Sequence, residues 1–303
     1  MPKVSAGIMP FSQSCQPNSL PPIDTLVVGS RTFHLTRQPV LMGIVNVTPD
    51  SFSDGGLYFE PTAALNQALQ LAADGADLLD IGGESTRPFA EPVAETEELR
   101  RVIPLIRAIR QHSDIPISID TYKATVAQAA LDAGANLIND ISALRFDPQM
   151  AQVAAAAKVP VVLMHMQGQP RTMQVAPHYD DVVAEVKAFL AERRAFALAN
   201  GITPHNIILD VGIGFGKNLH HNLELLRRLN EFLDLGSSLL LGVSRKAFIG
   251  TLLDQPVTGR DIGTLGAIAV GLLRGARIIR THNVRLAKEL CTVMSAVLYG
   301  PEP

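Results

Sequence analysis

Eight polar side chains follow short apolar runs along this 303-residue sequence, and their chemistry suits a ligand site. They are Asn46, Glu84, Asp120, Asn139, His165, Asp210, Lys246 and Arg280. A carboxylate that ends an apolar run needs hydrogen-bond donors, because burying an unpaired charge is costly. Asp120 and Asp210 accept hydrogen bonds, Asn139 both accepts and donates, and Lys246 donates. This set favours a planar heteroaromatic ring with donors along one edge and acceptors along another.

A second group of side chains suits an anion. Thr86, Arg87, Arg280 and His282 offer hydroxyl, guanidinium and imidazole groups, which bind phosphate oxygens well. Asn46 offers a neutral oxygen that Mg²⁺ accepts when waters and substrate phosphates complete its coordination. The sequence has no His, Cys and Asp cluster for a dedicated metal cage, so the substrate would bring most of the metal's ligands. We therefore predict a site with a ring side and an anion side.

The glycine-rich segment 210–217 suggests a phosphate-binding loop, but its spacing is wrong for one. Lys217 is followed by Asn218 rather than by Ser or Thr, and the glycines do not match the required pattern. We expect these glycines to let the backbone turn sharply and approach a flat ligand. Arg245 is interpreted as structural, and His165 as either a core residue or part of the pocket wall.

The elements that position these residues alternate between short apolar strands and amphipathic helices. Strands are expected at 40–45, 76–82, 116–120, 136–140, 160–165, 206–210, 238–243 and 276–280, each followed by a helical segment. Eight such units over about 250 residues favour a closed (β/α)8 TIM barrel, in which all strand carboxyl ends meet at one face. A β-hairpin around Gly29-Ser30 is expected to plug the opposite end. An open doubly wound sheet is the alternative, although segment 46–56 lacks its phosphate fingerprint.

Composition limits the class of protein. The net charge is −3 and no basic run exceeds two residues, so no nucleic-acid partner is expected. The apolar segment 262–273 is far shorter than the roughly 20 residues of a membrane span. Two distant cysteines, Cys15 and Cys291, fit a cytoplasmic protein without disulfides. Residues 1–22 are interpreted as a loose tail without a secretory signal, and residues 23–303 as one domain.

Seven motifs, taken together, resemble the dihydropteroate synthase family over residues 23–300. They are Gly43-Ile-Val-Asn-Val-Thr-Pro-Asp-Ser-Phe-Ser-Asp-Gly55, Asp80-Ile-Gly-Gly-Glu-Ser-Thr-Arg-Pro88, Ser118-Ile-Asp120, Asn139-Asp-Ile141, Gly214-Phe-Gly-Lys217, Ser244-Arg-Lys246 and Arg280-Thr-His282. The first two motifs are the most specific, because no general structural need dictates them.

The resemblance implies a pterin-binding barrel that acts as a transferase in folate biosynthesis. Such an enzyme joins 4-aminobenzoate to (7,8-dihydropterin-6-yl)methyl diphosphate, giving 7,8-dihydropteroate and diphosphate. By motif match, the pterin ring would be bound by Asp120, Asn139, Asp210 and Lys246. The diphosphate would be bound by Thr86, Arg280 and His282, with its Mg²⁺ on Asn46. The aminobenzoate site would be lined by Arg87, Pro88, Ser244 and Phe52.

The implied chemistry is SN1-like, with Asp120, Lys246 and Asn46 as catalytic residues. An arylamine is a weak nucleophile, so the pterin methylene must first become a cation as diphosphate leaves. Mg²⁺, Arg280 and His282 would stabilise the leaving charge, and Asp120 would stabilise the cation. Ordering of loops 48–56 and 86–90 would exclude water that traps the cation.

The sequence departs from the family's usual motifs at three places. Val211 replaces the usual proline after Asp210, Phe89 replaces a frequent glycine after Arg87-Pro88, and Asn283 replaces the usual aspartate after His282. The first change leaves Asp210 in place. Phe89 affects the shape of the second loop, and thus the aminobenzoate side rather than the pterin side.

Two other functions remain open from sequence. A corrinoid-linked methyltransferase acting on methyltetrahydrofolate would keep the ring-binding residues without needing Asn46, Arg87 or His282. A non-catalytic pterin-binding paralogue would bind the ring with degraded loops, whereas both loops are intact here. The family is commonly dimeric, so a homodimer is expected. Leu286, Leu290, Val293 and Val297 offer an apolar face, unless they pack on their own barrel.

Overall fold

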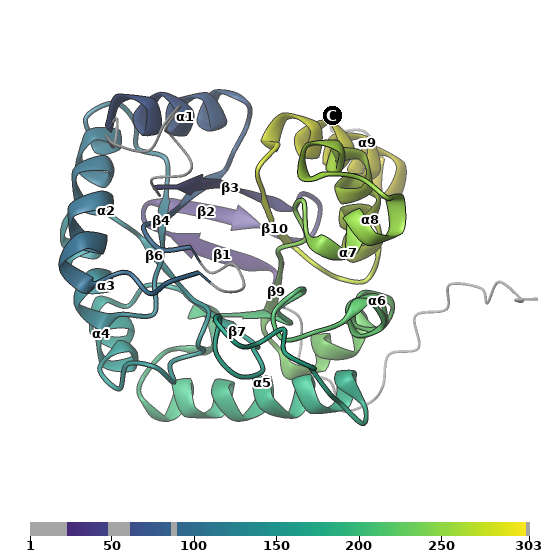
Figure 1. Cartoon of the computed structure of the whole chain (residues 1–303). Helices are drawn as coiled ribbons and strands as arrows, with labels where there is room; N and C mark the ends of the chain where they lie inside the picture. The colour runs from purple at the N-terminus through teal and green to yellow at the C-terminus, as the bar shows by residue number, and fades with distance from the viewer. Residues whose placement is uncertain (1–22, 48–60, 86–89, 301–303) are drawn as a thin grey trace, which may run out of the picture.

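The computed structural model of the chain describes residues 23–47, 61–85 and 90–300. Eight of its strands form a closed barrel in the order β10-β3-β4-β5-β6-β7-β8-β9. Figure 1 shows these strands with the helices around them. The barrel strands are β3 (Val40–Asn46), β4 (Leu78–Gly82), β5 (Ile117–Asp120), β6 (Leu137–Asp140), β7 (Val161–Met164), β8 (Ile207–Asp210), β9 (Ser238–Leu241) and β10 (Ile278–Thr281).

The barrel closes where its last strand lies between its first strand and its seventh. Ile278 of β10 pairs with Val40 of β3, and Ile279 of β10 pairs with Leu241 of β9, both in parallel register. An open doubly wound sheet would leave two unpaired edges, so that alternative is excluded. The predicted (β/α)8 barrel is confirmed.

Side chains of the barrel strands alternate between an inner and an outer environment, as the two-residue period of a strand requires. In β4, Leu79 and Ile81 belong to the outer core beneath the helices, whereas Leu78 belongs to the inner core. Asp80 therefore faces the barrel interior, where it meets Arg280 of β10. The same alternation delivers the other site residues to the interior.

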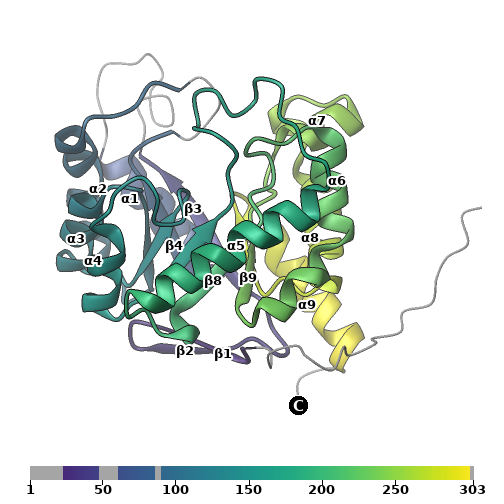
Figure 2. The ribbon, with the colours of Figure 1, turned by 90° about the horizontal axis from the view of Figure 1, so that it is seen from below.

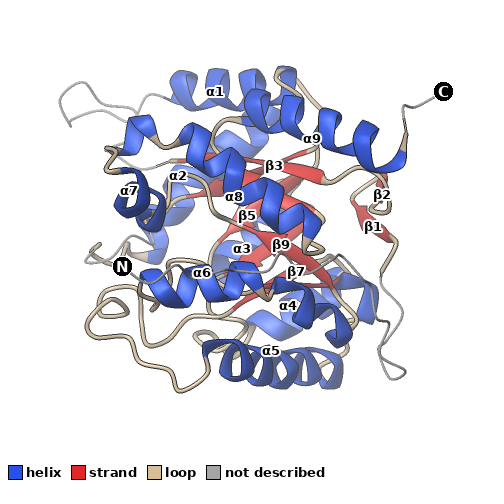
Figure 3. Cartoon of the chain, turned by 90° about the vertical axis from the view of Figure 1, so that its right-hand side faces the viewer, coloured by secondary structure: helices blue, strands red, loops and turns tan. Residues whose placement is uncertain are grey.

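Nine helices surround the strands in the described part of the chain, and Figure 3 shows them as an outer layer. They are α1 (Pro61–Ala73), α2 (Glu95–Arg110), α3 (Ala124–Asp132), α4 (Met150–Ala157), α5 (Val182–Ala199), α6 (Leu219–Arg227), α7 (Ala247–Leu253), α8 (Asp261–Leu273) and α9 (Val284–Tyr299). The short 3₁₀ helices are η2 (Pro204–Asn206), η3 (Leu229–Leu235) and η4 (Val257–Gly259). The apolar pattern of the sequence predicts one helix over 219–233, but α6 ends at Arg227 and η3 follows it. The same pattern does not predict α7.

A β-hairpin closes one end of the barrel, as predicted. Strands β1 (Thr25–Val28) and β2 (Arg31–His34) pair in antiparallel fashion around Gly29 and Ser30, and Gly29 has a φ of +60°. Leu26 and Val28 pack with inward-facing residues from the beginnings of the barrel strands. Figure 2 shows the hairpin across that end. The ligand-binding face must therefore be at the carboxyl ends of the strands.

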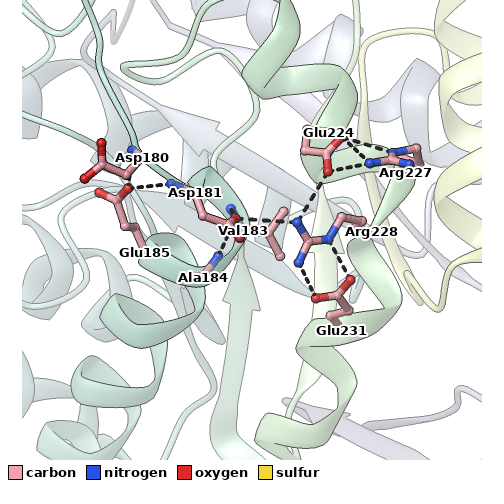
Figure 4. A network of polar contacts seen from close by, with 9 residues as sticks. All are labelled: Asp180, Asp181, Val183, Ala184, Glu185, Glu224, Arg227, Arg228 and Glu231. Carbon is pink, nitrogen blue, oxygen red and sulfur yellow. Dashed lines mark hydrogen bonds and ion pairs between the residues drawn. The ribbon is translucent and has the colours of Figure 1, made fainter.

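A network of charged side chains joins the beginning of α5 to the end of α6 (Figure 4). The carboxylate of Asp181 caps α5 by accepting hydrogen bonds from the backbone N–H groups of Val183 and Ala184. Arg228 lies 3.5 Å from Asp181 and forms a 2.7 Å ion pair with Glu231. Because these groups are partly exposed to solvent, each ion pair is expected to add little to stability.

Within the described ranges, no helix has the length and apolar character needed to cross a membrane. The tail predicted for residues 1–22 lies outside the described residues. The single-domain organisation predicted for residues 23–303 stays a prediction.

Candidate active site

Arg280 is the centre of a charged cluster inside the barrel. Its Nε donates to Asp80 Oδ2 at 2.6 Å, and its Nη2 donates to Asp120 Oδ2 at 2.8 Å. The three residues come from β10, β4 and β5, which the closed barrel brings together. Asp80 is fully buried, while the side chains of Asp120 and Arg280 keep 12% and 21% of their surface exposed. The cluster is thus reachable from the strand ends.

Burial changes the protonation of Asp120. Removal from water raises the pKa of this carboxyl to about 7, and the nearby Asp80 charge acts in the same direction. The Arg280 guanidinium opposes the shift but does not overcome it. Asp120 can therefore gain or lose a proton near neutral pH, which makes it a candidate for a role that depends on charge.

Asn139 joins the cluster from β6. Its side-chain amide donates to Asp80 Oδ2 at 3.1 Å, and the residue is buried. The neighbouring Asp140 has a different role, because its two carboxylate oxygens accept from the backbone N–H groups of Ser142 and Leu144, at 2.7 Å each. Asp140 fixes the loop after β6, and Asn139 faces the site.

Asp210 ends β8 and lies in the interior of the barrel with 7% of its surface exposed. Its Oδ1 accepts a hydrogen bond from the backbone N–H of Gly212 at 2.8 Å. Burial raises the pKa of this carboxyl, and the charges of Lys246, Lys217 and Arg280 act in the opposite direction. These cations can hold Asp210 ionised as an acceptor for ligand N–H groups.

Lys246 lies at the beginning of α7, and its Nζ is 4.1 Å from the centroid of the Phe215 ring. Burial lowers the pKa of the ammonium group to about 8, and the Asp210 charge limits this shift. Lys246 is thus a cation and donor next to an aromatic wall. This combination suits one edge of a planar ring.

The glycines of segment 210–217 permit sharp turns, as predicted, and two of them lie close against protein atoms. Gly212, Gly214 and Gly216 all have positive φ. A Cβ on Gly212 would be 1.9 Å from the carbonyl oxygen of His165, and one on Gly216 would be 2.8 Å from Gln167. The segment is therefore held against the backbone that follows β7. The expectation that the segment also approaches a flat ligand stays a prediction.

His165 is a core residue rather than an open pocket wall. Its Nδ1 lies 2.9 Å from the buried Nζ of Lys217, and its ring packs edge-on against Phe189. Burial lowers the pKa of this imidazole to about 2, and the Lys217 charge adds to the shift. A histidine that stays neutral in this way serves as a hydrogen-bond partner, not as an acid.

Ser244 and His282 meet at the strand ends next to the charged cluster. Ser244 Oγ lies 2.9 Å from His282 Nδ1, and the backbone N–H of His282 donates to the same oxygen at 3.1 Å. The two residues follow β9 and β10, which are neighbours in the barrel. The structure therefore brings together two positions that the motif match assigned to different substrates.

Comparison with known proteins decides the family. A family model described as "Pterin binding enzyme" matches residues 42–282. The Haemophilus influenzae dihydropteroate synthase is 47% identical over 85% of this chain and 94% of its own length. The chain belongs to the dihydropteroate synthase family.

Solved structures of this family agree in detail with the barrel. The Xanthomonas albilineans dihydropteroate synthase with 4-aminobenzoic acid superposes with a TM-score of 0.86 at 46% identity, covering 92% of this chain and 99% of that one. The same enzyme in complex with 7,8-dihydropteroate gives a TM-score of 0.83 at 45% identity, covering 91% and 100%. The resemblance predicted from the seven motifs is confirmed.

Several residues predicted by motif match lie outside the described part of the chain. They are Phe52, Thr86, Arg87 and Pro88, together with the departure at Phe89. Asn46 is described and ends β3, partly exposed, opposite Gly82 of β4. Its neutral amide fits the single protein ligand expected for Mg²⁺. The described residues contain no group of three or more His, Cys, Asp or Glu side chains able to hold a metal.

Glu84 reaches the strand ends, but its carboxylate is already engaged. It accepts from the Tyr122 hydroxyl at 2.8 Å and from Lys123 Nζ at 2.6 Å. The same ammonium also donates to the Val93 carbonyl and to the buried Glu98. Glu84 is therefore a structural anchor next to the site rather than a free ligand group.

Two residues with prominent contacts received no role from sequence. Lys217 is buried and donates to the Phe215 carbonyl at 2.9 Å, in addition to its contact with His165. Asp80 holds both Arg280 and Asn139. The strand alternation of segment 78–82 was the available signal for Asp80, because it places this carboxylate inside the barrel.

Proposed function

We propose that this chain is a dihydropteroate synthase in folate biosynthesis, which condenses (7,8-dihydropterin-6-yl)methyl diphosphate with 4-aminobenzoate. The observation that supports this most is the cluster in which Arg280 lies between Asp80 and Asp120 at the strand carboxyl ends. In this cluster the proposed anion-binding cation, Arg280, lies directly beside Asp120, a proposed ring-binding carboxylate. Family relatives that bind 4-aminobenzoic acid and 7,8-dihydropteroate support the same assignment.

The ring side of the site would use four residues. Asp210 and Asp120 would accept from ring N–H groups, and Asn139 and Lys246 would donate to ring carbonyl or imine atoms. Asn139 and Asp210 are buried, so leaving their polar atoms without a hydrogen-bond partner would be costly, and a ligand that supplies the partner is favoured. The rigid glycine turn at Gly212 orients Asp210 by a 2.8 Å hydrogen bond.

The anion side would use Arg280 and His282, with Thr86 as a further ligand. Arg280 is held by Asp80 and Asp120, so it needs no large movement to receive diphosphate oxygens. Asn46 would hold Mg²⁺, which supplies charge stabilisation for the leaving diphosphate when bound.

The mechanism that these residues support separates bond breaking from bond making. Arg280 and His282 bind the departing diphosphate, so negative charge leaving the methylene carbon is met by fixed donors. An ionised Asp120 stabilises the developing methylene cation. The arylamine nitrogen of 4-aminobenzoate then forms a bond to that carbon and releases one proton to solvent. Its proposed surroundings are Arg87, Pro88, Ser244 and Phe52.

The test is release of diphosphate from the pterin substrate with Mg²⁺ and 4-aminobenzoate. Arg280→Ala and Asn46→Ala should suppress release by at least about 100-fold, as expected for loss of a donor to leaving charge. Arg100→Ala is the matched control, because this arginine is exposed and pairs only locally with Glu97. Thermal unfolding of each variant checks that the fold is kept.

Each failure of this test has a distinct meaning. Tight pterin binding without diphosphate release would support the non-catalytic paralogue. Methyl transfer from methyltetrahydrofolate to a corrinoid, without diphosphate release, would support the methyltransferase. Release in the wild type that Arg280→Ala leaves unchanged would contradict the proposed anion site.

We also infer that the chain acts as a cytoplasmic homodimer. A groove of about 390 Å³ between α6, α7 and α8 is lined by Leu223, Phe248, Ile249, Leu252 and Val270. On α9, by contrast, Leu290 packs partly on the chain's own core, although Val293 and Val297 are exposed. The apolar groove, with Leu252 and Val270 exposed on α7 and α8, favours that face for a second copy.

Two variants distinguish these faces. Val270→Arg should convert the dimer to a monomer in sedimentation experiments, because it places a charge in the groove. Val297→Arg is the equivalent change on α9 and should leave the dimer intact. The opposite result would move the interface to α9, and a monomeric wild type would exclude both.

A further inference from the structure

Asp80 has an unusual environment for a charged side chain. It is the third residue of β4, it is fully buried, and the inner core directly below it contains Leu78 and Met42. One of its oxygens, Oδ2, accepts from both Arg280 Nε at 2.6 Å and Asn139 Nδ2 at 3.1 Å. The other oxygen, Oδ1, has no hydrogen-bond partner among the described residues.

Charge balance alone does not explain a carboxylate at this position. Arg280 already has a second carboxylate partner, because its Nη2 donates to Asp120. A buried carboxylate with a half-satisfied set of bonds is costly, and replacing buried ionic groups by apolar ones is often neutral or stabilising. The retained charge therefore calls for a role other than stability.

The contacts themselves indicate that role. Two bonds to one guanidinium, at Nε and at Nη2, fix the plane of Arg280, whereas Nη1 takes part in neither bond. The bond from Asn139 fixes the plane of its amide, so that its carbonyl oxygen has one orientation relative to the ring side. A single carboxylate oxygen thus holds one group from each side of the site.

We propose that Asp80 is a positioning residue, whose Oδ2 fixes both the Arg280 guanidinium and the Asn139 amide and so couples the anion side of the site to the ring side. This inference rests on the proposed function for the identity of the two sides. Asp80 does not touch either substrate in this role. It acts through the orientation of the two residues that would touch them.

The first experiment measures binding by calorimetry, with inorganic diphosphate plus Mg²⁺ as one probe and 2-amino-4-hydroxypteridine as the other. Arg280→Ala should weaken mainly the diphosphate, and Asn139→Ala should weaken mainly the pteridine. Asp80→Ala should weaken both by roughly tenfold or more, since small displacements of a positioned group have large effects. If Asp80→Ala weakened binding of only one probe, or of neither, the proposed coupling would be overturned.

The second experiment uses kinetics and a conservative variant. Asp80→Ala should lower kcat/KM by roughly 100-fold. Asp80→Asn can keep an acceptor oxygen toward both Arg280 and Asn139, with its NH₂ in place of the unpaired Oδ1. Its kcat/KM should therefore be at least about tenfold higher than that of Asp80→Ala. Asp77→Ala is the control, because this carboxylate precedes β4 at the opposite end of the strand, accepts a hydrogen bond from the Leu41 N–H, and should stay within about threefold of wild type.

A triple variant, compared with its double-variant background, separates positioning from a general structural effect. If Asp80 acts through Arg280 and Asn139, adding Asp80→Ala to an Arg280→Ala, Asn139→Ala background should change kcat/KM by less than about threefold. If Asp80→Ala still lowered kcat/KM by roughly 100-fold in the Arg280→Ala, Asn139→Ala background, the proposal would be overturned. If Asp80→Ala fails to fold, the Asp80→Asn variant is compared in both backgrounds instead.

Failure of the proposed function would give a different pattern. In that case the wild type would release no diphosphate, whereas the calorimetric comparison of Asp80→Ala with wild type would still test the positioning role. A wild type that binds neither probe would overturn the proposal together with the function.

Discussion

Gly212 packs directly against the backbone carbonyl of His165, so closely that a Cβ on residue 212 would lie 1.9 Å from that oxygen. The contact joins the exits of β8 and β7, and the backbone N–H of His165 also donates to the Asp210 carbonyl at 2.9 Å. Gly212 in turn donates its own N–H to the Asp210 carboxylate. The orientation of a central site carboxylate thus depends on a position where only glycine fits.

Gly212→Ala should therefore destabilise the fold strongly. The variant combines a positive φ with an overlap against backbone that cannot move aside, so we expect a loss of at least about 3 kcal/mol in the free energy of unfolding. Gly201→Ala is the matched control, because Gly201 has a φ of +88° but its Cβ would only touch Ala155 at 3.8 Å. That variant should lose about 1–2 kcal/mol. Equal losses in urea unfolding would show that the close contact has no separate cost.

Asp120 makes catalysis depend on pH near neutrality. Burial raises the pKa of this carboxyl to about 7, so it becomes neutral as the pH falls through that value. Because the proposed mechanism needs its negative charge, kcat/KM should fall as the pH drops below about 7, whereas loss of the Lys246 proton, with a pKa of about 8, lowers it on the alkaline side. Asp120→Asn should lose the acid side of the profile and keep the alkaline side. An unchanged profile in Asp120→Asn would assign the pH dependence to another group.

The barrel and most of the ring side could be predicted from sequence, and the reason is periodicity. Apolar strands that end in Asp120, Asn139 and Asp210 place these residues at one face of any parallel barrel. The specific residues that pair inside the barrel could not be predicted in this way. Arg280 meets Asp80 across 200 positions and Asp120 across 160, and only the closed barrel decides that its guanidinium lies between them.

The remaining differences between the sequence predictions and the structure have local causes. Asn139 and Asp140 are adjacent, polar and buried, so sequence alone does not say which faces the site; the loop N–H groups of Ser142 and Leu144 engage Asp140. Glu84 looked like a site residue because it follows a strand, yet Lys123 binds it from the next unit of the barrel. Helix α7 has only seven residues, too few for a helical period to stand out.

Asn283, where the family usually has aspartate, has a specific environment in this chain. Its amide donates to Asp261 Oδ2 at 2.9 Å, while its oxygen accepts from the Leu286 N–H and caps α9. Asp261 is also held by both ends of the Arg245 guanidinium, which agrees with the structural role predicted for that arginine. Asn283→Asp would keep the cap but place two carboxylates together.

We expect Asn283→Asp to lower the free energy of unfolding at pH 7 by about 1 kcal/mol, the typical value of the lost hydrogen bond. The deficit should shrink as the pH falls, because protonation of either carboxyl removes the repulsion and restores a donor. Thermal unfolding at about pH 3.5 and pH 7 measures this difference, because aspartate carboxyls ordinarily titrate at about pH 4 and the pKa of Asp261 is lowered by its bond to Arg245. Asn283→Ala loses the bond and the cap without adding charge, so its deficit should not depend on pH in the same way. A pH-independent deficit in Asn283→Asp would contradict the expected repulsion.

Lys217 should make stability rise with pH above neutrality. Burial lowers the pKa of its ammonium to about 7 in the folded chain, against 10.5 as the ordinary value. Between these two values the unfolded chain binds more protons than the folded one, so the free energy of unfolding increases with pH, by at most about 1.4 kcal/mol per pH unit. The contribution is complete above the unfolded pKa and is lost as the pH falls through about 7.

Lys217→Met isolates this contribution, because it fills a similar volume without a titrating group. Lys246, whose pKa burial lowers to about 8, is present in both proteins, so its own slope cancels in the comparison. Urea unfolding at pH 7, 8 and 9 should therefore show wild-type stability rising more steeply than that of the variant. Parallel slopes would mean that the folded protein keeps Lys217 charged, with its Nζ donating to His165 Nδ1 and to the Phe215 carbonyl throughout this range.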